Sequence, residues 1–253
     1  MDLQLSGLRA LVTGGTRGIG RAIVEAFLSE GTSVAFCARG ANAVKLTQEA
    51  LADSGAAVIG TALDVADPSA LTAWVDSSAK ALGGLDIVVS NVSALAIDDK
   101  PENWTASFEV DLMAAVRIVR AALPYLEASP AASIVAVSSV SGREIDFAAG
   151  PYGTMKAALT HYMQGLAYQL ADRGIRANTV SPGNTYFEGG VWANIEQNLP
   201  ELFSSAVALN PSGRMGTPDE VARTVVFVSS PVSSRTSGAN ILVDGALTRG
   251  VQL

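Results

Sequence analysis

A tyrosine and a lysine stand four residues apart in this chain, and a serine precedes the tyrosine by thirteen positions. Tyr152 and Lys156 fall on a predicted helix, where residues four apart share a face. A free phenol holds its proton too tightly for efficient exchange near neutral pH, and a nearby ammonium stabilises its deprotonated form. Ser139 ends a predicted strand, where its hydroxyl would hold a substrate oxygen against the phenol. The set predicts proton transfer to or from an alcohol or carbonyl oxygen.

A glycine-rich turn near the N-terminus predicts a dinucleotide site. The turn follows a predicted strand and opens a helix, so its backbone can approach a pyrophosphate whose charge lies at the helix N-terminus. Its spacing, G-x-x-x-G-x-G, differs from the common G-x-G-x-x-G fingerprint. The residues assigned to the phosphates are Gly14, Thr16, Arg17, Gly18, Ile19 and Gly20. Asp64 and Val65, after the third predicted strand, are assigned to the adenine.

The end of the second predicted strand carries no carboxylate. An acidic residue there usually binds the ribose 2′-hydroxyl of NAD, whereas this chain has Arg39, and Arg17 lies in the glycine turn. Two guanidinium groups suit a 2′-phosphate, which favours NADP(H) over NAD(H). The alternative is that one or both arginines are solvated surface charges.

Short apolar runs alternate with longer amphipathic segments along the chain. This pattern predicts an α/β fold with a parallel sheet covered by helices on both faces. The predicted strands are 10–13, 33–38, 57–63, 85–90, 133–138, 176–180 and 240–243. The predicted helices are 18–30, 41–54, 68–82, 103–126, 152–173 and 218–229. Residues 183–215 interrupt this rhythm and are predicted to form a substrate lid.

Composition limits the class of protein. The chain has 253 residues and a net charge of −7, with no basic stripe, so we expect one domain and no binding of nucleic acid. No apolar stretch reaches the ~20 residues that span a bilayer, and the N-terminus lacks a secretory pattern, so a cytoplasmic location is expected. One cysteine (Cys37) and one histidine (His161) make neither a disulfide within the chain nor a zinc site.

With these motifs the chain resembles the short-chain dehydrogenase/reductase family, in the single-domain branch whose members have about this length. The resemblance rests on the glycine turn, Asp64-Val65, Ser139, the Tyr152/Lys156 pair, Ser181-Pro182-Gly183 and Val243-Asp244-Gly245-Ala246. It implies a doubly wound, Rossmann-like fold with a seven-stranded parallel sheet, and hydride transfer with a nicotinamide cofactor. It also implies that Lys156 contacts the nicotinamide ribose, and that the protein is a homotetramer packed through residues 103–126, 152–173 and the last strand.

The chain departs from the family pattern at three places. Where the family reads Asn-Asn-Ala-Gly, only Asn91 carries over directly to cofactor binding, and Ser93 replaces a glycine. Where the family has a helix asparagine that supports a proton relay to the lysine, this chain has Asp111. In the motif Pro-Gly-x-x-x-Thr, which begins at Pro182 and Gly183, Phe187 replaces the threonine, so its hydrogen bond to the cofactor is lost or moves to Thr185.

The substrate is the least determined feature. Aromatic residues of the lid favour an apolar or aromatic ketone or secondary alcohol, unless they form the core of the lid itself. The residues assigned to the pocket are Ser93, Ser141, Arg143, Ile145, Tyr186, Phe187 and Trp192. A carbonyl reductase is the leading hypothesis, and a 3-oxoacyl-[acyl-carrier-protein] reductase is second. A non-catalytic nucleotide sensor and a nucleotide-sugar epimerase or dehydratase are the remaining alternatives.

Overall fold

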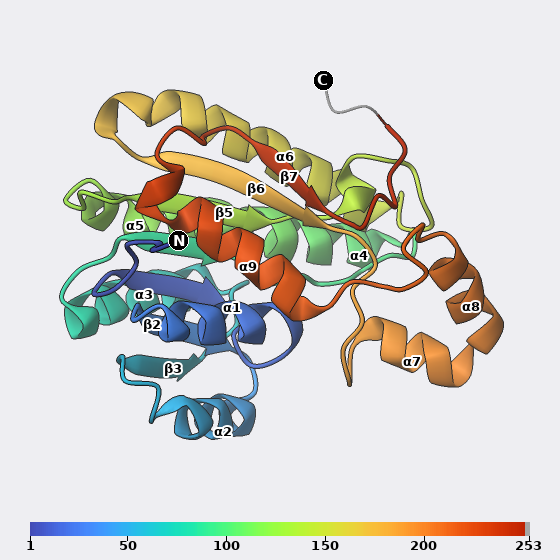
Figure 1. The fold of residues 1–253 in the computed structure, drawn as a ribbon, viewed down its shortest axis with the longest axis horizontal. Coiled ribbons are helices and arrows are strands. Elements are labelled where there is room, and N and C mark those ends of the chain that lie inside the picture. Colours follow the sequence, from blue (N-terminus) through green and yellow to red (C-terminus); the bar gives the residue numbers. More distant parts are fainter. Residues whose placement is uncertain (251–253) are drawn as a thin grey trace.

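Within residues 1–250, which a computed structural model describes, seven parallel strands form one sheet in the order β3-β2-β1-β4-β5-β6-β7 (Figure 1). The strands are β1 (Arg9–Thr13), β2 (Ser33–Ala38), β3 (Val58–Ala62), β4 (Ile87–Ser90), β5 (Ser133–Val137), β6 (Arg176–Pro182) and β7 (Asn240–Val243). The α-helices are α1 (Gly18–Ser29), α2 (Ala41–Leu51), α3 (Pro68–Leu82), α4 (Pro101–Ser107), α5 (Ala114–Leu126), α6 (Pro151–Gln169), α7 (Val191–Asn198), α8 (Pro200–Ala208) and α9 (Pro218–Ser229). The predicted fold class is therefore confirmed.

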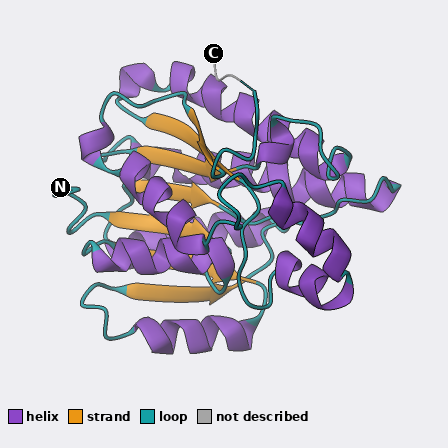
Figure 2. Cartoon of the chain, turned by 45° about the vertical axis from the view of Figure 1, so that its right-hand side comes forward, coloured by secondary structure: helices purple, strands orange, loops and turns teal. Residues whose placement is uncertain are grey.

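Helices cover both faces of the sheet (Figure 2). Successive strand residues point to opposite faces, so Leu11 of β1 packs with residues of α3, α5 and α6, whereas Ala10 and Val12 pack with residues of α1 and α9. Strands buried on both faces need apolar side chains at every position. This requirement explains why the central strands were recognisable as largely apolar runs.

The strand order reverses between β1 and β4, which are neighbours in the sheet although β2 and β3 separate them in the chain. Ligands of open α/β sheets bind in the crevice outside the carboxyl ends of the strands at such a point. The glycine turn follows β1 and Asn91 follows β4. The topology therefore brings the predicted cofactor residues together.

The helix predicted over residues 103–126 is three segments in the structure. α4 ends at Ser107, a π-helical stretch η1 covers Phe108–Met113, and α5 begins at Ala114. π-Helical turns are rare and are frequent at functional sites. The π-helical stretch was not predicted, because its hydrophobic spacing differs little from that of an ordinary helix.

The segment predicted as a lid contains two helices, α7 and α8, which lie beyond the carboxyl ends of the strands (Figure 1). Trp192, Ala206 and Met215 form a small hydrophobic cluster inside this segment. No helix of residues 1–250 is both long enough and apolar enough to cross a membrane.

Candidate active site

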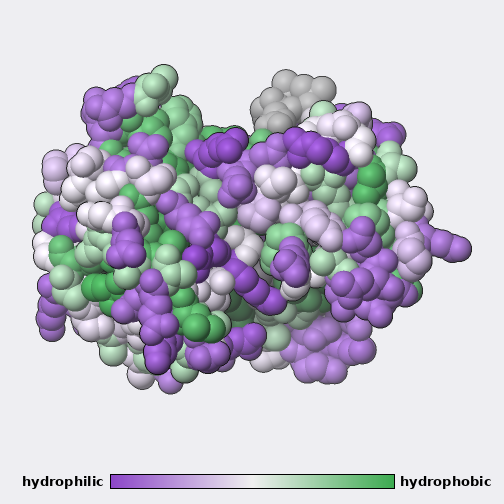
Figure 3. All heavy atoms as spheres, turned by 60° about the horizontal axis from the view of Figure 1, so that its bottom comes forward, coloured by the Kyte–Doolittle hydropathy of each residue, from purple (hydrophilic) through white to green (hydrophobic). Residues whose placement is uncertain are grey.

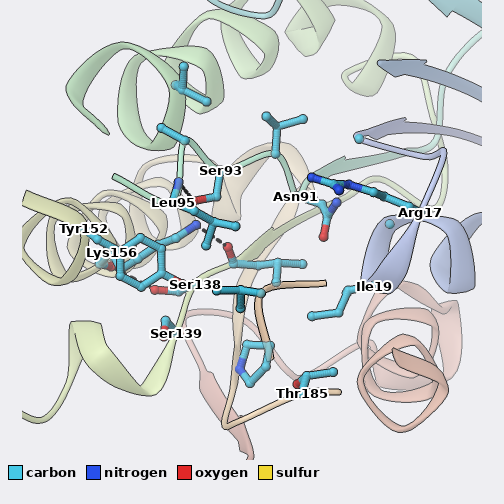
Figure 4. Close-up of a pocket in the computed structure, with 18 of the residues that line it drawn as sticks. Arg17, Ile19, Asn91, Ser93, Leu95, Ser138, Ser139, Tyr152, Lys156 and Thr185 are labelled. Carbon is cyan, nitrogen blue, oxygen red and sulfur yellow. Dashed lines mark hydrogen bonds between the residues drawn. The ribbon is translucent and has the colours of Figure 1, made fainter. Parts of the chain in front are cut away.

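A cavity of about 720 Å³ lies beyond the carboxyl ends of the central strands and extends from the glycine turn to Tyr152 (Figure 4). In Figure 3 the surface is hollowed near its centre, and hydrophobic side chains show in the hollow. The predicted site residues that line the cavity are Gly14, Thr16, Arg17, Ile19, Gly20, Arg39, Asp64, Val65, Asn91, Ser93, Ser139, Ser141, Tyr152, Lys156, Pro182, Gly183, Thr185, Phe187 and Trp192.

Three residues assigned to the substrate pocket do not line this cavity. The side chain of Ile145 is 92% exposed, and Arg143 is also exposed. Tyr186 packs edge-on against Phe203 within the lid, and its hydroxyl donates to Glu196 at 2.6 Å. That hydrogen bond raises the pKa of Tyr186. Tyr186 thus serves the packing of the lid, which is the alternative the sequence had left open for the aromatic residues.

Tyr152 and Lys156 reach the cavity from α6, and Ser139 reaches it from the end of β5 (Figure 4). The Lys156 Nζ lies 5.6 Å from the centroid of the Tyr152 ring. Lys156 is only 2% exposed, and its ammonium also donates to the carbonyl of Val137 at 3.1 Å. The positive charge is therefore fixed beside the phenol rather than free in solvent.

A short hydrogen-bonded chain leads from Ser139 to a carboxylate. The Ser139 Oγ donates to Ser141 Oγ at 3.2 Å, and Ser141 Oγ donates to Asp146 Oδ2 at 2.6 Å. The Ser139 Oγ also accepts from the backbone N–H of Ser141. To donate to a substrate oxygen, the O–H of Ser139 must turn away from Ser141 Oγ, while the Ser139 oxygen can keep the N–H of Ser141.

Asp111 lies behind the cavity rather than in its wall. The π-helical stretch carries it to 3.2 Å from Lys156 Nζ, measured to Asp111 Oδ1, and both side chains are buried. Asp111 Oδ2 accepts from the backbone N–H of Ala94, which belongs to the loop after β4. Asp111 Oδ1 makes no directed hydrogen bond, so its contact with Lys156 is an ion pair. Asp111 therefore joins Lys156 to the loop that borders the cavity.

The cofactor end of the cavity offers unsatisfied donors to an anion. Arg17, the N-cap residue of α1, makes no capping hydrogen bond with its side chain, and the first turn of α1 holds no acidic residue. Uncapped N–H groups and the helix dipole attract negative charge. Arg17 and Arg39 are exposed at this end, and Arg39 forms no ion pair with any residue of 1–250. This donor set fits the phosphates of a dinucleotide.

Asn91 fixes the glycine turn to the neighbouring strand. Its backbone N–H donates to Thr13 Oγ1 at 2.9 Å, and its side-chain amide donates to the Thr13 carbonyl at 3.0 Å. Ser93, at the position of a family glycine, accepts from the N–H of Leu95 through its hydroxyl. Both residues shape the loop that forms one wall of the cavity.

The lid touches the glycine turn directly. The ring of Phe187 packs against Gly18, and an Arg17 Nη1 donates to the Gly189 carbonyl at 3.3 Å. Thr185 donates its hydroxyl to the carbonyl of Gly183 at 3.1 Å. Phe187, which the sequence assigned to the substrate pocket, thus contacts the phosphate turn.

Replacing Gly18 by Ala is expected to displace the lid. Gly18 has φ +52°, and a Cβ there would lie 2.5 Å from Phe187 Cζ. Overpacking of this kind costs roughly 1–3 kcal/mol, and thermal unfolding should report it together with weaker NADPH binding. Gly55 is the matched control, since it has φ +84° with nothing within 4 Å of its Cβ position. G55A carries the backbone strain without the clash, and equal effects of the two variants would contradict the Phe187 contact.

Two further groups have no place in the chemistry of the site. Burial raises the pKa of the Cys37 thiol to about 12, so Cys37 behaves as a core residue of β2 and not as a nucleophile. His161 is exposed. Within residues 1–250 no group of three or more His, Cys, Asp or Glu side chains is arranged to hold a metal ion.

Sequence reasoning missed residues that the fold brings to the cavity from separate segments. Asp146 and Phe147 come from the loop before α6, and the Phe147 ring meets Trp192 edge-on at 5.9 Å. No residue spacing in the sequence identifies this loop as part of the site, because its residues reach the cavity only through the tertiary packing of the loop against the lid.

Comparison with known proteins gives matches over nearly the whole chain. A family model described as "Enoyl-(Acyl carrier protein) reductase" matches residues 14–248. An isoepoxydon dehydrogenase of Penicillium expansum is 42% identical over 98% of this chain and 97% of the relative. A 3-oxoacyl-[acyl-carrier-protein] reductase of Vibrio cholerae is 31% identical over 97% of this chain and 99% of its own. The crystal structure of L-sorbose reductase from Gluconobacter frateurii, complexed with NADPH and L-sorbose, superimposes with a TM-score of 0.91 at 27% identity, covering 99% of this chain and 100% of that one.

Proposed function

The chain belongs to the short-chain dehydrogenase/reductase family, and on this premise we propose that it is an NADP(H)-dependent carbonyl reductase that interconverts a ketone and a secondary alcohol. It is an oxidoreductase acting on CH–OH and C=O groups of small molecules with a nicotinamide cofactor. The observation that supports a carbonyl reductase is the convergence of Ser139, Tyr152 and Lys156 on the cavity that the glycine turn also lines.

Three side chains of the site have different roles at the substrate oxygen. Tyr152 donates its phenolic proton to the oxygen during reduction and accepts a proton from the alcohol during oxidation. Ser139 donates its O–H to the same oxygen and holds it at the phenol. Lys156 keeps a positive charge at the phenol and stabilises the phenolate that remains after donation. When bound, the nicotinamide supplies or takes up the hydride.

We propose that the 2′-phosphate of NADP(H) binds Arg39, assisted by Arg17. Both guanidinium groups are exposed at the cofactor end, and no carboxylate follows β2 to bind a ribose hydroxyl. The NADPH complex of the sorbose reductase supports this preference.

Replacing Arg39 by Asp is expected to weaken NADPH binding roughly tenfold or more, because the phosphate loses a charge-assisted partner and meets a like charge. NADH, which has no 2′-phosphate, should bind R39D as it binds the wild type. Fluorescence titration of both cofactors measures the two affinities. K45D, which makes the same charge change at an exposed lysine of α2, controls for net charge. Equal losses for NADPH and NADH would refute the assignment.

The proposed substrate is a ketone whose body is largely apolar. Phe147, Trp192, Val191 and Ile195 line the cavity near the lid, and apolar walls with a few placed polar groups are typical of small-molecule sites. The Penicillium relative, a dehydrogenase, supports alcohol–ketone chemistry.

A 3-oxoacyl-[acyl-carrier-protein] reductase is the second candidate, supported by the Vibrio relative. Docking of an acidic carrier would need free basic side chains, but Arg173 forms an ion pair with Glu127 at 2.7 Å. Turnover of acetoacetyl-carrier protein well above that of a simple ketone would favour this candidate over the first.

We also propose a homotetramer in the cytoplasm. Exposed aromatic side chains on the outer helices support association: Trp104 on α4, Phe108 on η1 and Tyr168, which is 90% exposed, on α6. Light scattering would give the mass of the assembly. A monomer would contradict the proposed tetramer but would leave the proposed reaction unaffected.

A further inference from the structure

Asp146 places a carboxylate in the wall of the same cavity as Ser139 and Tyr152. We propose that this carboxylate selects ketones that bear a hydroxyl group one or two carbons from the carbonyl, together with the corresponding diols. The inference rests on the proposed function and narrows it from ketones in general to hydroxyketones.

The carboxylate of Asp146 has acceptor capacity that the protein leaves unused. Its Oδ1 accepts from the N–H of Ala148 at 2.8 Å, and its Oδ2 accepts from Ser141 Oγ at 2.6 Å. A carboxylate offers about four acceptor positions. No lysine or arginine of residues 1–250 lies within ion-pair distance of it. A half-buried carboxylate without a cation is stabilised by additional hydrogen-bond donors.

The position of Asp146 determines which atom of the ligand must carry the hydrogen-bond donor. In the proposed mechanism the substrate oxygen lies at the hydroxyls of Ser139 and Tyr152. Asp146 Oδ2 is two hydrogen bonds from Ser139 Oγ, through Ser141. A hydroxyl on the carbon next to the carbonyl, or on the following carbon, spans that separation. The charge of Asp146 also disfavours ligands with a carboxylate or phosphate at this place.

Apolar side chains in the same cavity explain why the ligand is not polar throughout. Phe147 and Trp192 meet edge-on at 5.9 Å, and both line the cavity. They suit the hydrocarbon part of a compact ring or chain. The two walls together define a ligand with one apolar side and one hydroxyl beside the reacting oxygen.

The alternative is that Asp146 only caps its own turn and holds Ser141. Two variants separate the possibilities. D146N keeps an oxygen for the N–H of Ala148 but removes the charge, whereas S141A removes the intermediate hydroxyl and keeps the carboxylate. If Asp146 acts only through Ser141, the two variants will have the same effect.

The experiment is calorimetric titration of the NADPH complex, which cannot take up a hydride from an alcohol, with trans-cyclohexane-1,2-diol and, in parallel, with cyclohexanol. The wild type is expected to bind the diol roughly tenfold more tightly or better, as for a hydrogen bond to a charged group. D146N should bring the ratio of the two affinities close to one, and S141A should retain the preference. A wild-type ratio near one overturns the proposal, even if D146N does not fold. A preference that survives in D146N, or that is lost equally in S141A, also overturns it. Tighter binding of trans-2-aminocyclohexanol than of the diol would refute the hydroxyl assignment.

Turnover separates this proposal from the proposed function. With NADPH, 2-hydroxycyclohexanone should be reduced with a higher kcat/KM than cyclohexanone, and D146N should remove the difference. Diol preference without turnover of either ketone would refute the reductase and leave the role of Asp146 intact. Turnover of both ketones with equal kcat/KM would overturn the role of Asp146 and leave the reductase intact.

Discussion

Replacing Tyr152 by Phe is expected to lower the turnover of any ketone substrate about 10²–10⁴-fold, which is the usual contribution of a positioned proton donor. The phenylalanine keeps the ring that packs at the half-buried position on α6 but has no proton to give to the substrate oxygen. NADPH affinity should change little, because the proposed phosphate site is the glycine turn, which lies at the other end of the cavity. Steady-state reduction, followed by NADPH absorbance, and fluorescence titration measure the two effects.

Y168F is the matched control for this substitution. Tyr168 lies on the same helix, and its side chain is 90% exposed, so loss of its hydroxyl should leave turnover unchanged. Full activity of Y152F would exclude Tyr152 as the proton donor. Loss of NADPH binding in Y152F would mean that the residue is needed for the shape of the cavity.

The sequence predicted the parts of the site that depend on local spacing. Tyr152 and Lys156 share a helix face wherever that helix lies, and the glycine turn fixes its own position between β1 and α1. The central strands were recognisable because they are buried on both faces, whereas the edge strands β3 and β7 are only partly buried. Since parallel strands end at one edge of the sheet, Ser139 and Asn91 had to approach that turn.

Other features depend on tertiary placement and could not be predicted. Asp111 reaches Lys156 because η1 replaces regular helix over Phe108–Met113, and hydrophobic spacing does not reveal a π-helical turn. Whether an aromatic residue of the lid faces the cavity depends on the orientation of α7 and α8. Trp192 lines the cavity, whereas Tyr186 bonds Glu196 instead.

The ion pair of Lys156 with Asp111 has consequences for both stability and chemistry. Its partners are 2% and 0% exposed in their side chains, with Nζ and Oδ1 3.2 Å apart. Burying a charge is unfavourable unless a partner compensates it. The pair therefore keeps the ammonium of Lys156 at a defined place beside Tyr152. The neutral asparagine expected from the family would supply an acceptor but no opposite charge.

Replacing Asp111 by Ala is expected to destabilise the protein by about 3–5 kcal/mol, because it leaves a buried ammonium without its partner. Turnover should fall as well, since Lys156 and the N–H of Ala94 both lose their contact. D111N should be milder, because its side-chain oxygen still accepts one of these donors. Urea denaturation gives the free energy of unfolding, and D53A, which removes an exposed carboxylate, controls for net charge. If D111A unfolded at the same urea concentration as D53A and kept its turnover, the ion pair would contribute to neither. If D111N were as damaged as D111A, the charge itself would be what this site requires.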